Sequence, residues 1–283
     1  MTRISMIRKM WDPRRPAARS RRTGAKERKA GRAAKTRQSH PTGTDRVVLY
    51  GWHPVRAALE NPDRHIRKLI VTENALRRLN QSGTVLPVEP QIVAPEAFLA
   101  YVPAEAVHQG LLAEADPLPD ASIDDVSSGD LVLVLDQITD PHNVGAILRS
   151  AAAFAVTALV ITARHSPEAT GVLAKSASGA LEYVPIIAVT NLARGLEALK
   201  ARGFLIVGLG SDAELELSAA PLQLPLAVVL GAEGKGLRQL TRSTCDALAK
   251  LTLPGRIKSL NVSNAAALAL HIVTARLSRV PPA

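Results

Sequence analysis

Apolar and polar positions follow one another in blocks that predict strands and helices in turn. From residue 47 onward, short runs rich in Val, Leu and Ile precede stretches with the apolar spacing of a helix. VVLYGWHPVRAAL and IRKLIVTENA each predict a strand followed by a helix, and the first helix is entered through Pro54. Residues 47–116 are therefore predicted to form a small α/β domain.

A loop-like stretch, residues 117–130, follows this domain and predicts a linker, because PLPDASIDDVSSGD contains two prolines and several acids. Beyond it, continuous apolar strands alternate with helices, which is typical of a parallel sheet covered on both faces. Residues 131–283 are predicted to form this second α/β domain. The expected strands are 131–136, 158–162, 184–189, 204–210, 226–231 and 248–254, and the expected helices are 143–154 and 168–178 and those following residues 191, 236 and 263.

Positive charge is concentrated at the start of the chain. Residues 1–46 hold 15 of the 35 Lys and Arg residues but three of the 25 acids, so the formal charge of +10 belongs to this segment. The segment has few large apolar residues and predicts a disordered basic arm. Contact with nucleic acid is favoured for it, and a solubilising tail or an import signal is the alternative.

Composition and spacing exclude several classes of protein. Cys245 is the single cysteine, and the histidines show no HxxxH spacing, so no metal site is expected. No apolar run is long enough to span a membrane, which favours a cytoplasmic protein. VVLGAEGKGL lacks the spacing of a phosphate loop, and FLIVGLGSDA is a weak match to a dinucleotide-binding turn.

Three loops that leave predicted strands carry polar residues, and in parallel sheets ligands bind at such loops. The first, DPHNVGAILRSA, places Asn143 and Arg149 at the start of an otherwise apolar helix, where an arginine needs a partner or a ligand. The second, VVLGAEGKGL, sets Glu233 among glycines that let the backbone approach a ligand, with Gly231 ending the strand.

The third loop, LPGRIKSLNVSNAAALAL, has more polar residues than a helix start requires. Ser263 is predicted to be the N-cap of the last helix, since its hydroxyl can accept from the next turn. Ser259 and Asn261 alternate with Leu260 and Val262, so an extended backbone turns the two polar side chains to one side. They are predicted to line a site.

Taken in order, these three loops resemble the three motifs of the SpoU class (SPOUT superfamily) of RNA ribose 2'-O-methyltransferases. The resemblance covers roughly residues 131–278. YGWHPVRAAL and VHQGLLAEADPL also resemble the substrate-binding domain of the branch that modifies 23S ribosomal RNA guanosine, a ribosomal-protein-like RNA-binding fold. The resemblance then extends over everything but the arm.

The resemblance implies an α/β SPOUT domain with a trefoil knot, S-adenosyl-L-methionine as cofactor, RNA as partner and a homodimer. By motif position it implies catalytic or RNA-positioning roles for one group of residues and cofactor contacts for another. The first group is Asn143, Arg149, Glu233, Ser259 and Asn261, and the second is Gly231, Leu253 and Leu260.

The function expected from the sequence is therefore 2'-O-methylation of a ribose, that of a guanosine, in ribosomal RNA. Two alternatives stay open: methylation of tRNA, and an inactive RNA-binding protein of the same fold. Arg149 is expected either to act as a base toward the 2'-hydroxyl or, because guanidinium holds its proton to high pH, to be a charged clamp.

Overall fold

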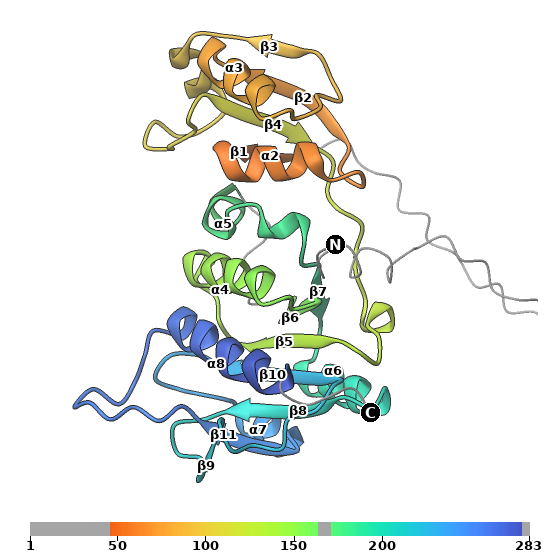
Figure 1. Ribbon diagram of the computed structural model, residues 1–283, viewed down its shortest axis with the longest axis vertical. Helices are drawn as coiled ribbons and strands as arrows, with labels where there is room; N and C mark the ends of the chain where they lie inside the picture. Colours follow the sequence, from red (N-terminus) through yellow and green to blue (C-terminus); the bar gives the residue numbers. More distant parts are fainter. Residues whose placement is uncertain (1–45, 164–170, 279–283) are drawn as a thin grey trace, which may run out of the picture. The chain divides into compact units, whose positions relative to one another are not determined.

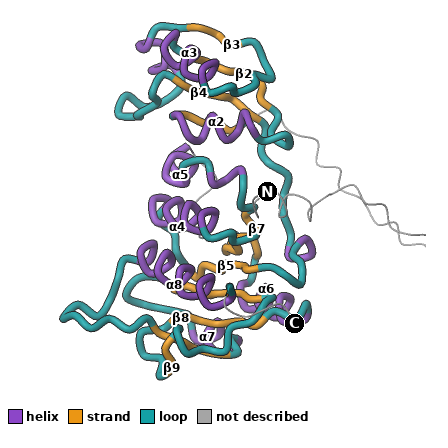
Figure 2. Tube along the Cα trace, viewed as in Figure 1, coloured by secondary structure: helices purple, strands orange, loops and turns teal. Residues whose placement is uncertain are grey.

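The computed structural model describes residues 46–163 and 171–278. Apart from Arg46, the predicted arm lies outside the described residues, as does the expected start of the helix at 168–178. Figures 1 and 2 show the helices and strands within these ranges.

The first described segment folds as a four-stranded sheet in the order β1-β4-β2-β3. β4 is antiparallel to β1 and β2, and β3 is parallel to β2. β2 and β4 supply fully buried side chains, and α2 and α3 bury their apolar faces against the sheet. The bounds are β1 (Val47–Tyr50), α2 (Trp52–Glu60), β2 (Ile66–Val71), α3 (Glu73–Gln81), β3 (Pro90–Ile92), η1 (Pro95–Ala100) and β4 (Leu111–Ala115).

The second described segment forms a seven-stranded sheet in the order β7-β6-β5-β10-β8-β11-β9, with every neighbouring pair parallel. The parallel sheet predicted from the apolar runs is confirmed. Its strands are β5 (Leu131–Asp136), β6 (Ala158–Thr162), β7 (Ile186–Val189), β8 (Leu205–Leu209), β9 (Leu215–Glu216), β10 (Leu226–Gly231) and β11 (Ala247–Lys250). The helical segments are η2 (Ile123–Asp125), α4 (Pro141–Ala153), α5 (Gly171–Ala177), η3 (Ala180–Glu182), α6 (Leu192–Ala201), α7 (Gln239–Thr244) and α8 (Val262–Leu277).

Helices cover both faces of this sheet, and successive side chains of β5 show why. Leu133 and Leu135 belong to the apolar cluster that includes α4 and α8, whereas Val132 and Val134 belong to the cluster that includes α6. Side chains alternate between the faces of a strand, so a run of apolar residues without polar interruption serves both clusters at once. In Figure 1, α4 and α8 lie together beside β5 and β10.

Several details differ from the sequence expectations; the strand expected at 248–254, for example, is β11, which ends at Lys250. β9 lies in ELELSAAPLQLP, where no regular element is predicted; two residues give too short a pattern to recognise. α4 begins at Pro141, two residues before the expected start, because Asp140 caps it by accepting from the His142 amide.

Gly145 permits the close crossing of α4 and α5. A Cβ at this position would collide with Ser176 and lie 2.9 Å from the Ala177 amide nitrogen. The absence of a side chain at Gly145 therefore lets the two helices approach closely.

A buried ion pair joins the loop after α2 to η3. Arg64 donates through two guanidinium nitrogens to Glu182, at 2.7 and 3.1 Å, and their side chains are 4% and 1% exposed. Asn61 donates to the same carboxylate at 2.8 Å, and Arg64 also donates to the Asp116 carbonyl. Every strong polar group of this cluster therefore has a partner, which burial of charge requires.

Removing the carboxylate should be far more costly here than at the surface. Glu182→Ala leaves Arg64 buried without its counterion, so the free energy of unfolding is expected to fall by about 3–5 kcal/mol. Glu60→Ala, which removes the exposed Arg56–Glu60 pair on α2, is the matched control and should cost less than about 1 kcal/mol. Urea denaturation measures both, and equal losses would contradict the buried role.

Candidate active site

Three loops meet at the carboxyl edge of the seven-stranded sheet. They follow β5, β10 and β11 and lead into α4, α7 and α8. β5 and β10 are paired in register, with Asp136 opposite Gly231, so the first two loops start side by side. The sheet therefore brings together the polar segments singled out in the sequence.

Asn261, and not Ser263, is the N-cap of α8. Its side-chain oxygen accepts from the Ser263 amide at 2.9 Å and from the Ser263 hydroxyl at 2.6 Å. The prediction that Ser263 caps the helix is therefore wrong. Asn and Ser are almost equally good caps, so the sequence could not decide between positions two residues apart.

The Asn261 side chain also links the third loop to the first. Its amide nitrogen donates to the Asn143 side-chain oxygen at 3.0 Å, across 118 residues of chain. Asn261 therefore uses its oxygen for the helix start and its nitrogen for this link. Asn143 keeps its own amide nitrogen, a donor of two hydrogens.

Glu233 joins the same place from the second loop. One carboxylate oxygen accepts from the Val262 amide at 2.9 Å, which satisfies an otherwise free N–H at the start of α8. A negative charge is favourable beside a helix N-terminus. The second carboxylate oxygen makes no hydrogen bond to another described residue and is left as an acceptor.

Three of the five predicted catalytic residues, Asn143, Glu233 and Asn261, thus form one connected group. Together they offer amide donors and a carboxylate acceptor at an exposed edge of the sheet. Such a group can hold a ligand that both donates and accepts hydrogen bonds, as sugar hydroxyls do.

Arg149 stands apart from this group. It lies on the exposed side of α4, six residues after Asn143, which corresponds to about 9 Å along the helix axis and a different side of the helix. Within residues 46–163 and 171–278, its guanidinium makes no hydrogen bond or ion pair with another side chain. Ser259 is exposed too, and its side chain makes no hydrogen bond to Asn143, Glu233 or Asn261. The structure does not unite these two residues with the rest.

The residues predicted to touch a cofactor surround the same edge. Gly231 ends β10, and a Cβ there would collide with Gly236, so the AEGKG loop folds directly over it. Leu260 is 38% exposed and Ile257 is 78% exposed on the loop before α8. Leu253 on that loop accepts a hydrogen bond from Lys258 through its carbonyl, at 2.9 Å. Exposed apolar side chains beside a polar group are typical of a ligand site.

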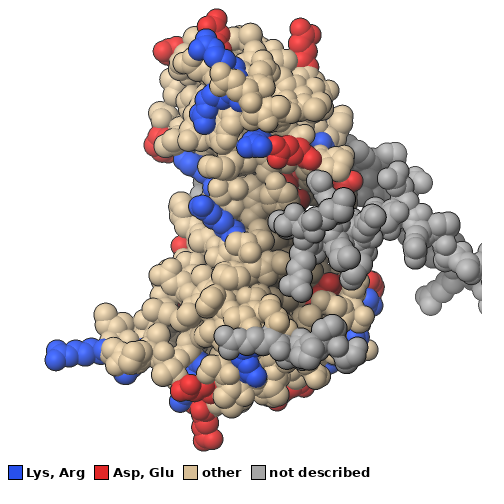
Figure 3. Space-filling model, viewed as in Figure 1, with Lys and Arg blue, Asp and Glu red and all other residues tan. Residues whose placement is uncertain are grey.

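The loop between β11 and α8 projects from the sheet in Figure 1, and Figure 3 shows Lys and Arg side chains at the tip of the same projection. Arg256 and Lys258 are the basic residues of this loop. Positive charge here attracts polyanions without reading their sequence.

Asp136 is a polar residue of this edge that the sequence predictions missed. Its side chain is completely buried and accepts from the backbone and guanidinium nitrogens of Arg238, at 3.0 and 2.6 Å. An acid closing a wholly apolar strand was a signal that could have marked it.

Two further findings bear on the kind of site. In the described ranges, no three His, Cys, Asp or Glu side chains gather as metal ligands would. Likewise, none of the helices described is both long and apolar enough to cross a bilayer.

Comparison with family models gives two matches. Residues 130–271 match the SpoU rRNA Methylase family, and residues 48–121 match the RNA 2'-O ribose methyltransferase substrate-binding family.

Curated relatives align over most of their length. The 23S rRNA (guanosine-2'-O-)-methyltransferase RlmB of Pseudomonas putida is 38% identical over 231 residues, covering 78% of this chain and 93% of the relative. Those of Ralstonia nicotianae and Vibrio cholerae are 38% and 37% identical, covering 83% and 79% of this chain and 97% and 94% of the relatives.

Solved structures share the fold. The SpoU methyltransferase AviRb of Streptomyces viridochromogenes superimposes with a TM-score of 0.70 at 22% identity, covering 82% of this chain and 90% of that one. Its complex with the cofactor AdoMet gives a TM-score of 0.68 over the same shares of the two chains, also at 22% identity.

The two tasks of Asn261 can be separated by substitution. Asn261→Ser keeps an N-cap oxygen but is too short to reach Asn143, whereas Asn261→Ala loses both. We expect Asn261→Ala to lower the free energy of unfolding by about 1 kcal/mol and Asn261→Ser to change it by a few tenths. Because neither variant can make the link to Asn143, both should show the same loss of enzymatic activity. Normal activity in Asn261→Ser would show that the link to Asn143 has no role.

Proposed function

The chain belongs to the SpoU rRNA methylase family, and on that premise we propose that it transfers a methyl group from S-adenosyl-L-methionine to a ribose 2'-hydroxyl, that of a guanosine in 23S ribosomal RNA. The observation that carries the proposal is the connected group of Asn143, Glu233 and Asn261 at the edge of the sheet. The link from Asn261 to Asn143 is not needed to cap the helix, for which Ser, Thr or Asp would serve, so its presence favours an active enzyme over an inactive relative.

The choice of substrate is supported by the relatives and by the first sheet. Relatives of 36–38% identity, covered over more than nine-tenths of their length, carry the name of a 23S rRNA guanosine methyltransferase. The substrate-binding family model matches residues 48–121. In this proposal the basic arm, residues 1–46, adds attraction to RNA phosphates, and the enzyme works in the cytoplasm, where its RNA is.

The residues around the carboxyl edge fit the proposed cofactor. Leu253 and Leu260 offer apolar surface for an adenine ring. The loop that begins at Gly231 and the separate loop that ends at Asn261 offer backbone N–H and C=O groups. S-adenosyl-L-methionine supplies a methyl group on a positively charged sulfur. We also propose that the chain forms the trefoil knot that is expected of this family.

The chain's own residues then have to hold the ribose and deal with its proton. A ribose hydroxyl is too weakly acidic to be ionised at neutral pH, so it must be held in line with the methyl group while its proton is taken. The Asn143 amide and the free oxygen of Glu233 can position the nucleotide. Arg149 either accepts the proton, which requires its neutral form, or, as a charged clamp on a neighbouring phosphate, lets a phosphate oxygen accept it.

A homodimer would complete this site. Arg149 lies on the exposed side of α4, and α8, packed beside it, leaves Leu268 37% exposed with His271 near it. His271 contacts Phe154 edge to face, with ring centroids 6.2 Å apart. We propose that a second copy of the chain covers this face. Arg149 of one protomer would then lie beside the connected polar group of its partner and act in that site.

Loss of the Arg149 side chain should slow the chemistry more than it weakens binding. With 23S rRNA transcripts and labelled S-adenosyl-L-methionine, Arg149→Ala is expected to lower kcat by at least about 100-fold. Arg194→Ala, an exposed arginine on α6 at the other face of the sheet, is the control and should retain kcat. Resistance to alkaline cleavage at one guanosine would identify the product, and turnover unchanged in Arg149→Ala would refute both roles proposed for it.

Mixing two inactive variants tests whether the site is shared. If Arg149 acts in the partner's site, Arg149→Ala mixed with Asn261→Ala forms heterodimers with one intact site each, and random assortment restores about a quarter of normal activity. If both residues act within one chain, the mixture stays inactive. Light scattering at micromolar concentration should give the mass of a dimer, and a monomer would refute this part of the proposal.

A further inference from the structure

A buried carboxylate holds the end of the loop that carries Glu233. Asp136 is the last residue of β5, and its side chain has no exposed surface. It accepts from the backbone nitrogen of Arg238 at 3.0 Å and from the guanidinium Nε of the same residue at 2.6 Å. Each carboxylate oxygen therefore has a donor from Arg238. A buried carboxylate without such donors is unfavourable, so the pair constrains where Arg238 can lie.

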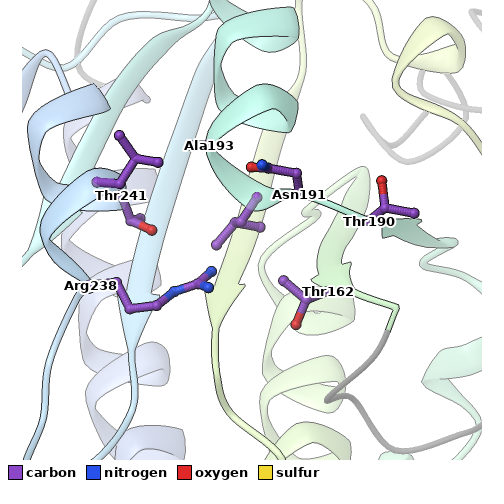
Figure 4. A pocket seen from close by; sticks show the side chains of 8 residues that line it. Thr162, Thr190, Asn191, Ala193, Arg238 and Thr241 are labelled. Carbon is purple, nitrogen blue, oxygen red and sulfur yellow. The ribbon is translucent and has the colours of Figure 1, made fainter.

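The two ends of the loop are fixed to the same residue of β5. Gly231, where the loop begins, lies opposite Asp136 in the pairing of β10 with β5. Arg238, where the loop ends and α7 follows, is bound to Asp136 through its backbone and its side chain. Figure 4 shows the Arg238 side chain extending from the start of α7 toward the end of β5. Asp136 therefore sets how far apart the two ends of the loop lie.

The backbone between these ends is rich in glycine. Gly234 and Gly236 have φ angles of 74° and 64°, and residues 233–236 are exposed. The Gly236 amide donates to the Ala232 carbonyl at 2.8 Å, which closes the loop on itself. Glycine leaves the backbone more conformational freedom than other residues do, so the shape of this loop depends on how firmly its ends are held.

Leu237 gives the end of the loop a second attachment, next to Arg238. A Cβ on Gly208 of β8 would lie 2.7 Å from a methyl carbon of Leu237. The glycine thus makes room for the leucine, which packs against the apolar cluster that includes β8 and α6. Packing of Leu237 accounts for the first glycine of FLIVGLGSDA.

We propose that Asp136 and Arg238 are positioning residues for the cofactor: by holding the end of the AEGKG loop, they keep its backbone N–H and C=O groups in the conformation that binds S-adenosyl-L-methionine. This inference rests on the proposed function, in which the loop lies against the cofactor. A loop that is already held in place does not have to be ordered when its ligand binds, so the affinity is higher. Neither side chain has to touch the cofactor for this effect.

Two substitutions of Arg238 separate this role from that of its charge. In Arg238→Gln, the side-chain nitrogen stands at the same position along the side chain as Nε and can still donate to Asp136. In Arg238→Met, a methyl group stands there and cannot donate. Both variants lose the positive charge and the two terminal nitrogens, so a contact of those groups with RNA or another ligand is lost equally. The difference between the variants therefore reports the hydrogen bond to Asp136.

Calorimetry with S-adenosyl-L-methionine, in the absence of RNA, gives the first measurement. Arg238→Met should bind the cofactor at least about tenfold more weakly than the wild type, and Arg238→Gln should stay within about threefold of it. Arg242→Met is the matched control, because Arg242 lies on α7 and pairs with Asp212 at the surface, at 2.8 Å. This variant should bind the cofactor as the wild type does.

Hydrogen exchange of the chain without cofactor gives a second measurement that does not depend on activity. The amides of residues 232–237 should exchange faster in Arg238→Met than in the wild type or Arg238→Gln, because the loop opens more often when its end is released. Should Arg238→Met fail to fold, the double variant Asp136→Leu with Arg238→Met takes its place, since it leaves no buried carboxylate unpaired. The double variant should show the same faster exchange and weaker cofactor binding.

Several results would overturn the proposal. Equal losses of cofactor affinity in Arg238→Gln and Arg238→Met would assign the effect to the charge or the terminal nitrogens. Normal affinity in both variants, or unchanged exchange of the loop amides when the donor is removed, would show that the pair does not position the loop. If the wild type binds S-adenosyl-L-methionine and all variants bind it equally, this inference fails alone. If the wild type does not bind it, the proposed function fails and the cofactor role of the pair fails with it.

Discussion

The parallel pairing of β5 with β10 determines where everything else in the second half of the chain can lie. Both strands are buried on both faces, so helices must pack above and below them, and the loops that follow the strands emerge at one edge. The register places Asp136 opposite Gly231, and the first and second loops diverge from that point. The starts of two loops that are far apart in the sequence thereby become neighbours.

Much of this arrangement could be predicted from the sequence because apolar runs report burial directly. LVLVLD and LAVVLG have no polar interruption, which requires that both faces be covered, and the structure has them at the centre of the sheet. The order of strands could not be read in this way, since pairing between distant strands leaves no periodic signal. The two-residue β9 was missed because it is shorter than any pattern.

The candidate site was predictable by residue type but not by contact. Asn143, Glu233 and Asn261 stood out as polar residues beside buried strands, yet nothing in the sequence shows that an amide of one donates to another. The start of α8 was placed two residues late because Ser263 and Asn261 are both good caps. Asp136 gives no sign in the sequence of its contact, because its partner Arg238 lies 102 residues away.

The double use of Asn261 has a consequence for how such a protein changes over evolutionary time. A helix start tolerates Ser, Thr or Asp in place of Asn, so selection for a folded chain alone would accept these replacements. None of them offers the amide nitrogen that reaches Asn143. A descendant could therefore keep its fold and its surface for RNA while its chemistry was lost through one conservative change. This position is where an enzyme of this architecture could most readily become a binding protein.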